Sequence, residues 1–250
     1  MIIVVDFGSQ TAHLIARRIK ELGTSCEIII PENAIEKVKQ SHPKGLIFSG
    51  GPAFVNDKNS PLIDKKIFDF KIPILGICYG QQVVAHLLGG KVAGGKIKEF
   101  GPAYVTHRSS LLFNHIPDKF RVWMSHGDSV TELPKGFSYI ATTENIKGGA
   151  IVDVKNNIYC VQFHPELTHT EYGQEILKNF LNICGENPKK EEIDIDAIVN
   201  NIKETVGDKK VIMALSGGTD SFVAAALITK AIGSQLIPVH VVSGLMREDA

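Results

Sequence analysis

Short apolar, β-branched runs alternate with segments of helical period in the first 90 residues of the chain. Residues 2–5 (IIVV) are wholly apolar, and residues 9–22 repeat apolar side chains at the helical period until Gly23. Three more strands are predicted at residues 25–30, 45–48 and 73–77, and a helix is predicted at residues 81–88. Apolar strands separated by helices indicate a parallel sheet that is covered on both faces.

The pattern changes after residue 91. Strand-like segments at 103–107, 120–124 and 138–143 follow one another with turn signals between them, which favours an antiparallel or mixed extension of the sheet. A strand at 159–163 and a helix at 173–184 follow. We therefore expect an α/β fold with a mixed sheet and helices on both faces.

A polar, charge-dense stretch, GENPKKEEIDID at residues 185–196, indicates a linker. We place the domain boundary there, which gives domains of residues 1–187 and 188–250. The second domain is predicted to hold helix 195–206, strand 210–215, a Gly-rich turn, helix 221–232 and strand 236–242. Such a β-α-β unit cannot bury enough apolar surface to form its own core, so we expect it to be the first, incomplete part of a larger domain.

Composition excludes several classes of protein. Lys plus Arg and Asp plus Glu both number 27, and this balance argues against nucleic acid or a membrane surface as the partner. No apolar run approaches the roughly 20 residues of a membrane span, and the N-terminus has no export signal. The four cysteines form no C-x-x-C pair. We expect a cytoplasmic location.

Cys78 lies at a predicted strand–turn–helix junction, in the segment GICYG at residues 76–80. Glycines two positions before and after it allow a tight turn, which is the nucleophile-elbow pattern. The turn places the thiol at a helix N-terminus, where the helix dipole favours the thiolate. A buried structural cysteine is the alternative, but the strand–turn–helix context favours a nucleophile.

A base for this nucleophile is predicted at His164. Glu166 lies two residues further along an extended run, so both side chains project to one face, and Pro165 keeps the segment extended. Glu166 can therefore hold His164 in one tautomer and stabilise its charged form. A solvated strand-end histidine is commoner for this motif alone, so the prediction depends on its combination with Cys78.

A third segment, SGGP at residues 49–52, follows a predicted strand. Its backbone N–H groups, with that of Tyr79, are candidates for an oxyanion hole. Considered alone, the segment is more often an ordinary Gly-Pro turn.

Together these segments resemble the class I glutamine amidotransferase family, through SGGP at 49–52, GICYGQQ at 76–82, SHGD at 125–128 and QFHPE at 162–166. The resemblance implies that Cys78 attacks the glutamine amide, that His164 moves protons and that Glu166 orients His164. It also implies that the backbone amides of Gly51 and Tyr79 form the oxyanion hole. The glutamine pocket would be lined by Gln82, Ser125, His126 and Asp128. Gln81 stands where relatives often carry Met.

The segment LSGGTDS at residues 215–221 has the geometry of a phosphate loop, between a predicted strand and a helix, without the G-K-[ST] of the common P-loop. Asp220 would repel phosphate unless a cation such as Mg²⁺ intervenes. A simple Gly-Gly turn is the alternative. The segment resembles the SGGxDS loop of the ATP pyrophosphatase family, which implies ATP contacts from Ser216, Gly217, Gly218, Thr219, Asp220 and Ser221. The family's following Asp-Asn-Gly-Leu is replaced here by residues 242–245, VSGL.

An amidotransferase domain followed by this loop, with LTHT at 167–170, resembles the GMP synthase branch of the family. That resemblance implies glutamine, ATP and XMP as ligands, with Mg²⁺ and ATP serving only the second domain. It implies glutamine hydrolysis that supplies ammonia for ATP-dependent amination of XMP to GMP, and a homodimer formed through a region beyond residue 250. The alternatives are an amidotransferase subunit for another acceptor, of the anthranilate or carbamoyl phosphate type, and a non-catalytic glutamine-binding module.

Overall fold

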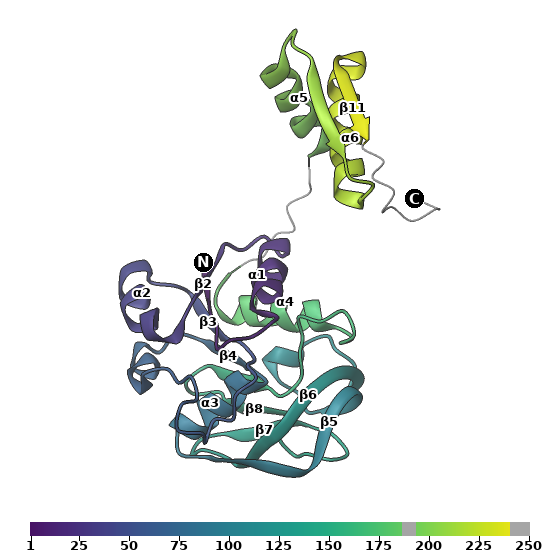
Figure 1. Ribbon diagram of the computed structural model, residues 1–250. Coiled ribbons are helices and arrows are strands. Elements are labelled where there is room, and N and C mark those ends of the chain that lie inside the picture. The colour runs from purple at the N-terminus through teal and green to yellow at the C-terminus, as the bar shows by residue number, and fades with distance from the viewer. Residues whose placement is uncertain (187–193, 241–250) are drawn as a thin grey trace. The chain divides into compact units, whose positions relative to one another are not determined.

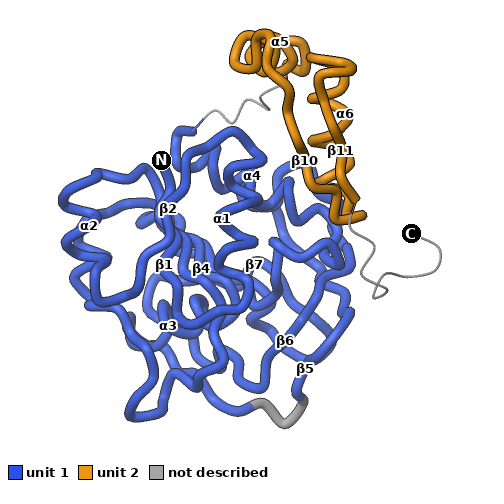
Figure 2. Tube along the Cα trace, turned by 45° about the horizontal axis from the view of Figure 1, so that its top comes forward, with its two compact units in different colours: residues 1–190 blue, residues 191–250 orange. Residues whose placement is uncertain are grey.

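The computed structural model describes residues 1–186 and 194–240. The chain forms two compact units, residues 1–190 and 191–250 (Figure 2). The first unit carries the candidate nucleophile and its base, and the second carries the candidate phosphate loop.

The first unit is built on a nine-stranded mixed sheet in the order β2-β1-β3-β4-β9-β8-β7-β5-β6 (Figure 1). Its parallel half consists of β1 (Ile2–Val5), β2 (Cys26–Ile29), β3 (Gly45–Phe48), β4 (Ile74–Ile77) and β9 (Ile158–Val161). Its antiparallel half consists of β5 (Lys91–His107), β6 (Lys119–Glu132), β7 (Ser138–Thr142) and β8 (Ala150–Asp153). The predicted mixed sheet is confirmed.

Helices cover both faces of the parallel half, which explains why its strands are apolar throughout. Ile2 and Val4 join one core cluster with α1 (Ala12–Glu21) and α4 (Gly173–Ile183). The alternate residues Ile3 and Val5 join a second cluster with α2 (Ala34–Ser41) and α3 (Tyr79–Leu87). Successive side chains of a strand point to opposite faces, so each face of β1 is buried beneath its own pair of helices.

The structure corrects the middle of the sequence analysis. The strands predicted at 103–107 and 120–124 are only parts of a much longer hairpin, β5 and β6 of 17 and 14 residues. The register of this hairpin shifts between Gly94 and Glu99, and such an irregularity hides the alternation of side chains on which the prediction relied. Neither α2 nor β8 was predicted; α2 buries only Ala34 and Val38, which is too weak a periodic signal.

The second unit pairs two parallel strands, β10 (Val211–Leu215) and β11 (Leu236–His240), with α5 (Ile195–Val206) and α6 (Thr219–Ile232). Residues 241–242 of the last predicted strand, and the VSGL segment, lie outside the described residues. Short 3-10 helices in the two units span Pro31–Asn33, Lys65–Phe70, Leu111–Phe113 and Gly233–Gln235. Across the described parts of the chain, no helix has the length and apolar character needed to cross a membrane.

Candidate active site

Cys78 forms the whole turn between β4 and α3. Its backbone has φ 52° and ψ −105°, a strained conformation for a residue with a side chain. A Cβ added at Gly80 would overlap the backbone carbonyl of Phe48, and one added at Gly76 would lie 2.9 Å from the backbone nitrogen of Gln81. Both glycines of the motif are therefore required by packing. The helix begins at Tyr79 instead of the predicted residue 81, so the thiol adjoins its N-terminus directly.

The base comes from the neighbouring strand. β9 lies parallel to β4, and the register pairs Ile77 with Val161. The backbone N–H of Cys78 donates to the carbonyl of Val161 at 2.8 Å. Because adjacent parallel strands end at the same edge of a sheet, the segment that follows β9 leaves the sheet beside the thiol and carries His164 to the nucleophile.

His164 is held by a buried carboxylate. Its Nδ1 lies 2.8 Å from Oε1 of Glu166, and the same oxygen accepts a hydrogen bond of 2.7 Å from the hydroxyl of Thr11. Thr11 precedes α1 and was not predicted. Nothing in its sequence context relates it to residue 166, since only the packing of α1 beside the sheet brings the two together.

Burial lowers the pKa of His164, but its interactions with the Cys78 sulfur as an acceptor and with the Glu166 carboxylate outweigh it and raise the pKa to about 10. Since Nδ1 bonds Glu166, Nε2 is the nitrogen left for the thiol. A proton that leaves Cys78 therefore has a strong acceptor beside it. His164 is therefore suited to act as the base for a cysteine nucleophile, which reacts as the thiolate.

The loop after β3 passes close to both groups. A Cβ at Gly50 would lie 3.2 Å from Cε1 of His164, and one at Gly51 would lie 2.8 Å from the carbonyl oxygen of Phe7. Gly51 and Tyr79 border the same cavity as Cys78. The oxyanion-hole role of their backbone N–H groups stays a prediction.

A cavity of about 260 Å³ opens on one side of Cys78. The predicted glutamine-pocket residues Gln82, Ser125, His126 and Asp128 all line it. The side-chain amide of Gln82 donates to the backbone carbonyl of Asp128 at 2.9 Å. Burial and the negative charge of Asp57 raise the pKa of the Asp128 carboxyl, while Lys98 opposes them.

His126 supports the wall of this cavity through internal bonds. Its Nδ1 lies 3.0 Å from the carbonyl oxygen of Asp128 and its Nε2 lies 3.0 Å from Oε2 of Glu99. Both partners are acceptors, so the ring donates to both only when it carries two protons. The ring nitrogens of His126 are therefore engaged within the protein, and its contribution to the pocket is to hold the backbone at Asp128.

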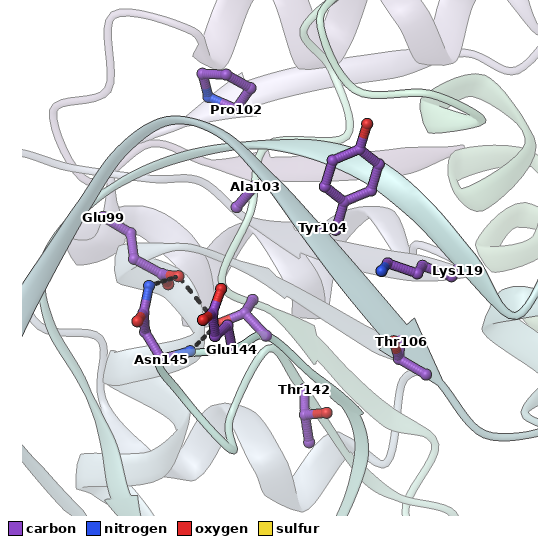
Figure 3. A pocket seen from close by; sticks show the side chains of 10 residues that line it. Glu99, Pro102, Ala103, Tyr104, Thr106, Lys119, Thr142, Glu144 and Asn145 are labelled. Carbon is purple, nitrogen blue, oxygen red and sulfur yellow. Dashed lines mark hydrogen bonds between the residues drawn. The ribbon is translucent and has the colours of Figure 1, made fainter.

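Glu99 is a buried site residue that the sequence analysis missed. Its other oxygen, Oε1, accepts hydrogen bonds from Thr143 Oγ1 at 2.9 Å and Asn145 Nδ2 at 3.0 Å. Burial raises the pKa of Glu99, but the bonds from His126, Asn145 and Thr143 together lower it below its usual value. Figure 3 shows Glu99 and Asn145 at the edge of a separate cavity of about 570 Å³. Glu99 thus links that cavity to the wall of the first.

A further cavity, of about 360 Å³, also borders the nucleophile. Cys78 and His164 both border it, together with Thr11, Trp123 and Leu167. Cys78 therefore lines both cavities.

The candidate phosphate loop lies between β10 and α6, as predicted. Gly217 has φ 79°, a conformation that suits glycine, and the N–H of Gly218 donates to Ser216 Oγ at 3.4 Å. The loop is exposed, and Asp220 lies in the first turn of α6. No group of three metal-ligating side chains occurs among the described residues.

Two family models match the chain. The model described as glutamine amidotransferase class-I matches residues 3–184, and the model described as NAD synthase matches residues 192–246.

Among curated proteins, the chain is 49% identical over 99% of its length to a glutamine-hydrolyzing GMP synthase of Caldicellulosiruptor saccharolyticus, and 48% identical over 100% to one of Clostridium perfringens. It covers 49% and 50% of those proteins, so it spans about half the length of these relatives.

Solved structures give the same picture for the first unit. A protein from Thermoplasma acidophilum, described as a putative GMP synthase subunit, matches with a TM-score of 0.62 and 33% identity, over 74% of this chain and 93% of that one. A glutamine amidotransferase from Thermotoga maritima matches with a TM-score of 0.52 and 19% identity, over 94% of this chain and 96% of that one. This second likeness concerns the fold alone.

Proposed function

Because this chain belongs to the class I glutamine amidotransferase family, we propose that its first unit hydrolyses glutamine to glutamate and ammonia. The observation that carries the proposal is the contact of one buried imidazole, His164, with both a thiol at a strained turn and a buried carboxylate. Glutamine would occupy the cavity lined by Gln82 and Asp128, with the Asp128 carboxylate near its α-amino group.

The reaction follows from the roles of these groups. The Cys78 sulfur attacks the side-chain carbonyl carbon of glutamine, and the N–H groups of Gly51 and Tyr79 stabilise the resulting oxyanion. When the tetrahedral intermediate collapses, His164 gives its proton to the departing nitrogen and ammonia leaves. His164 then takes a proton from water, which opens the thioester and releases glutamate.

We further propose that the whole protein uses this ammonia as a GMP synthase does, to aminate XMP activated by ATP. The relatives' printed names and the SGGTDS loop support this step. Ammonia released into water would be protonated and lose its nucleophilicity, so we expect the two reactions to be linked through an enclosed path.

Mg²⁺ is part of this proposal. Mg²⁺ is usually held by one or two carboxylates together with substrate phosphates and water, and the single exposed carboxylate of Asp220 beside an anion-binding turn fits that donor set. Asp220 would hold the ion, whose charge would neutralise the phosphates of ATP. We also propose a cytoplasmic location, supported by four free cysteines, and a homodimer for the whole protein.

A glutamine-mimicking electrophile tests the nucleophile. We expect mass spectrometry to find one adduct, on Cys78, because burial raises the pKa of the other thiols. The pKa of Cys26 rises to about 11, that of Cys184 rises to about 12, and that of Cys160 is also raised. Cys78→Ser should abolish both labelling and ammonia release. An adduct on another cysteine would refute the assignment, and glutamine binding without ammonia release would favour the non-catalytic module.

The acceptor is tested with the full-length parent supplied with XMP, ATP, Mg²⁺ and glutamine, by following GMP. Glutamine turnover without GMP would retain the glutaminase and reject the GMP synthase part. In that case an amidotransferase for another acceptor is favoured, and the SGGTDS loop should then make no contact with ATP.

A further inference from the structure

Gln162 touches the nucleophile, although no role has yet been given to it. It is the first residue after β9 and is fully buried. Its Nε2 lies 3.6 Å from the sulfur of Cys78 and donates to it. The register explains this contact: Ile77 pairs with Val161, so the next residue of each strand, Cys78 and Gln162, are neighbours.

The side-chain amide of Gln162 occupies a buried position where an apolar side chain would make the folded state more stable. Its Oε1 is buried and has no hydrogen-bond partner among the described residues. A buried carbonyl oxygen without a partner destabilises the folded state, and a methionine of similar volume would avoid this penalty. The feature that distinguishes Gln162 from other buried amides is the partner of its N–H, which is the sulfur of Cys78.

The surroundings of the sulfur indicate what the amide does. The neutral thiol donates to the backbone carbonyl of Ser125, at 3.6 Å. Once the thiol loses its proton, this hydrogen bond is lost and the carbonyl oxygen no longer stabilises the sulfur. The thiolate then depends on donors, and the structure provides the His164 imidazolium and the Gln162 amide. A donor gains strength when its acceptor is charged.

We propose that Gln162 is a further catalytic residue, whose side-chain N–H stabilises the thiolate of Cys78. The inference rests on the proposed role of Cys78 as the nucleophile, but its test requires no glutamine.

The chain provides a matched control in Gln81. This residue is also fully buried, its Oε1 also lacks a partner within the described chain, and its Nε2 makes one hydrogen bond, to the carbonyl of Gly148 at 2.8 Å. Its amide donates to a carbonyl and not to the sulfur. Gln81→Met therefore removes the same kind of group from the core without removing a donor to the nucleophile.

The experiment measures alkylation of Cys78 by iodoacetamide between pH 5 and 10, followed by mass spectrometry on the full chain. Iodoacetamide reacts with the thiolate and does not need the glutamine pocket. For Gln162→Met we expect the pH midpoint of alkylation to rise by about one unit and the rate below that midpoint to fall roughly tenfold, as loss of one hydrogen bond to a charged group predicts. Gln81→Met should stay within about twofold of the wild type.

Superimposable profiles for Gln162→Met and wild type would overturn the inference, and so would equal shifts for Gln162→Met and Gln81→Met. If Gln162→Met does not fold, Gln162→Leu also lacks the donor, and its pH midpoint of alkylation should rise by a similar amount. A shifted profile in a chain that releases no ammonia from glutamine supports the inference and rejects the proposed function. No alkylation of Cys78 at any pH overturns both.

Discussion

The carboxylate of Glu166 determines how the base of this site behaves. Its Oε1 accepts hydrogen bonds from His164 and Thr11, and its Oε2 is buried without a partner in the described chain. The pKa of His164 is about 10 in the folded protein and near 6.5 in the unfolded chain. Protonated His164 therefore stabilises the folded state fully at pH values below about 6.5, and this stabilisation is lost as the pH rises through about 10.

Glu166→Gln should therefore have two effects. The glutaminase kcat should fall about 10²- to 10⁴-fold with KM little changed, because the neutral amide no longer orients His164 or stabilises its charged form. The variant should also lose free energy of unfolding, most at pH values below about 6.5 and progressively less as pH approaches about 10. Steady-state kinetics and urea denaturation across this pH range measure both effects.

Glu171→Gln is the matched control, because Glu171 is an exposed carboxylate of the same region that pairs with Arg121. It should leave kcat unchanged and alter stability little. A kcat for Glu166→Gln within threefold of the wild type, or a stability loss that does not change with pH, would contradict the assigned role.

At the scale of elements, the β5–β6 hairpin forms one wall of the pocket. Its register places Glu99 opposite His126 and Gly94 opposite Asp128. Ser125, His126 and Asp128 all belong to β6, so the position of the pocket wall depends on how this strand is held. The buried pair of Glu99 and His126 makes that connection through side chains.

Glu99→Gln should weaken glutamine binding without changing the chemistry at sulfur. The amide oxygen can still accept from Thr143 and Asn145, but the amide nitrogen cannot accept a hydrogen bond from Nε2 of His126 as the carboxylate oxygen does. The weakened support of the Asp128 backbone should raise the KM for glutamine about fivefold, as expected for a loss of about 1 kcal/mol. Alkylation of Cys78 by iodoacetamide should not change.

Glu144→Gln is the control for this variant, because Glu144 lines the same cavity as Glu99 (Figure 3). It should keep the KM of the wild type. An unchanged KM in Glu99→Gln, or an equal rise in both variants, would show that the contact between Glu99 and His126 does not support the pocket.

At the scale of the whole molecule, the two units differ in how much apolar surface they bury. The first has core clusters on both faces of its sheet. Within residues 194–240 the buried hydrophobic residues are Ile232 and Leu236 alone, and large apolar side chains such as Ile212 and Phe222 are exposed. A unit with so little buried surface is expected to be much less stable than its neighbour.

Urea should therefore unfold this chain in two stages. Far-UV circular dichroism should lose the signal of α5 and α6 first, at low urea. Fluorescence of Trp123, the single tryptophan of the chain, should change only in the second stage, because it lies on β6 of the first unit. One transition seen at the same urea concentration by both probes would refute the difference in stability.

The sequence alone determined the features that arise from neighbouring residues. The apolar strands, the helix period and the glycines around Cys78 are local patterns, and the strand–turn–helix at the thiol follows from them. The long hairpin was predicted only in part, since its irregular register interrupts the alternation of side chains.

Only the tertiary structure decided which distant groups meet. Thr11 reaches Glu166 because α1 packs beside the sheet, and Gln162 reaches the thiol because β9 lies next to β4. Glu99 reaches His126 because β5 and β6 pair in one particular register. The physical reason is that strand order and register follow from the packing of the whole core, and no local pattern of residues records them.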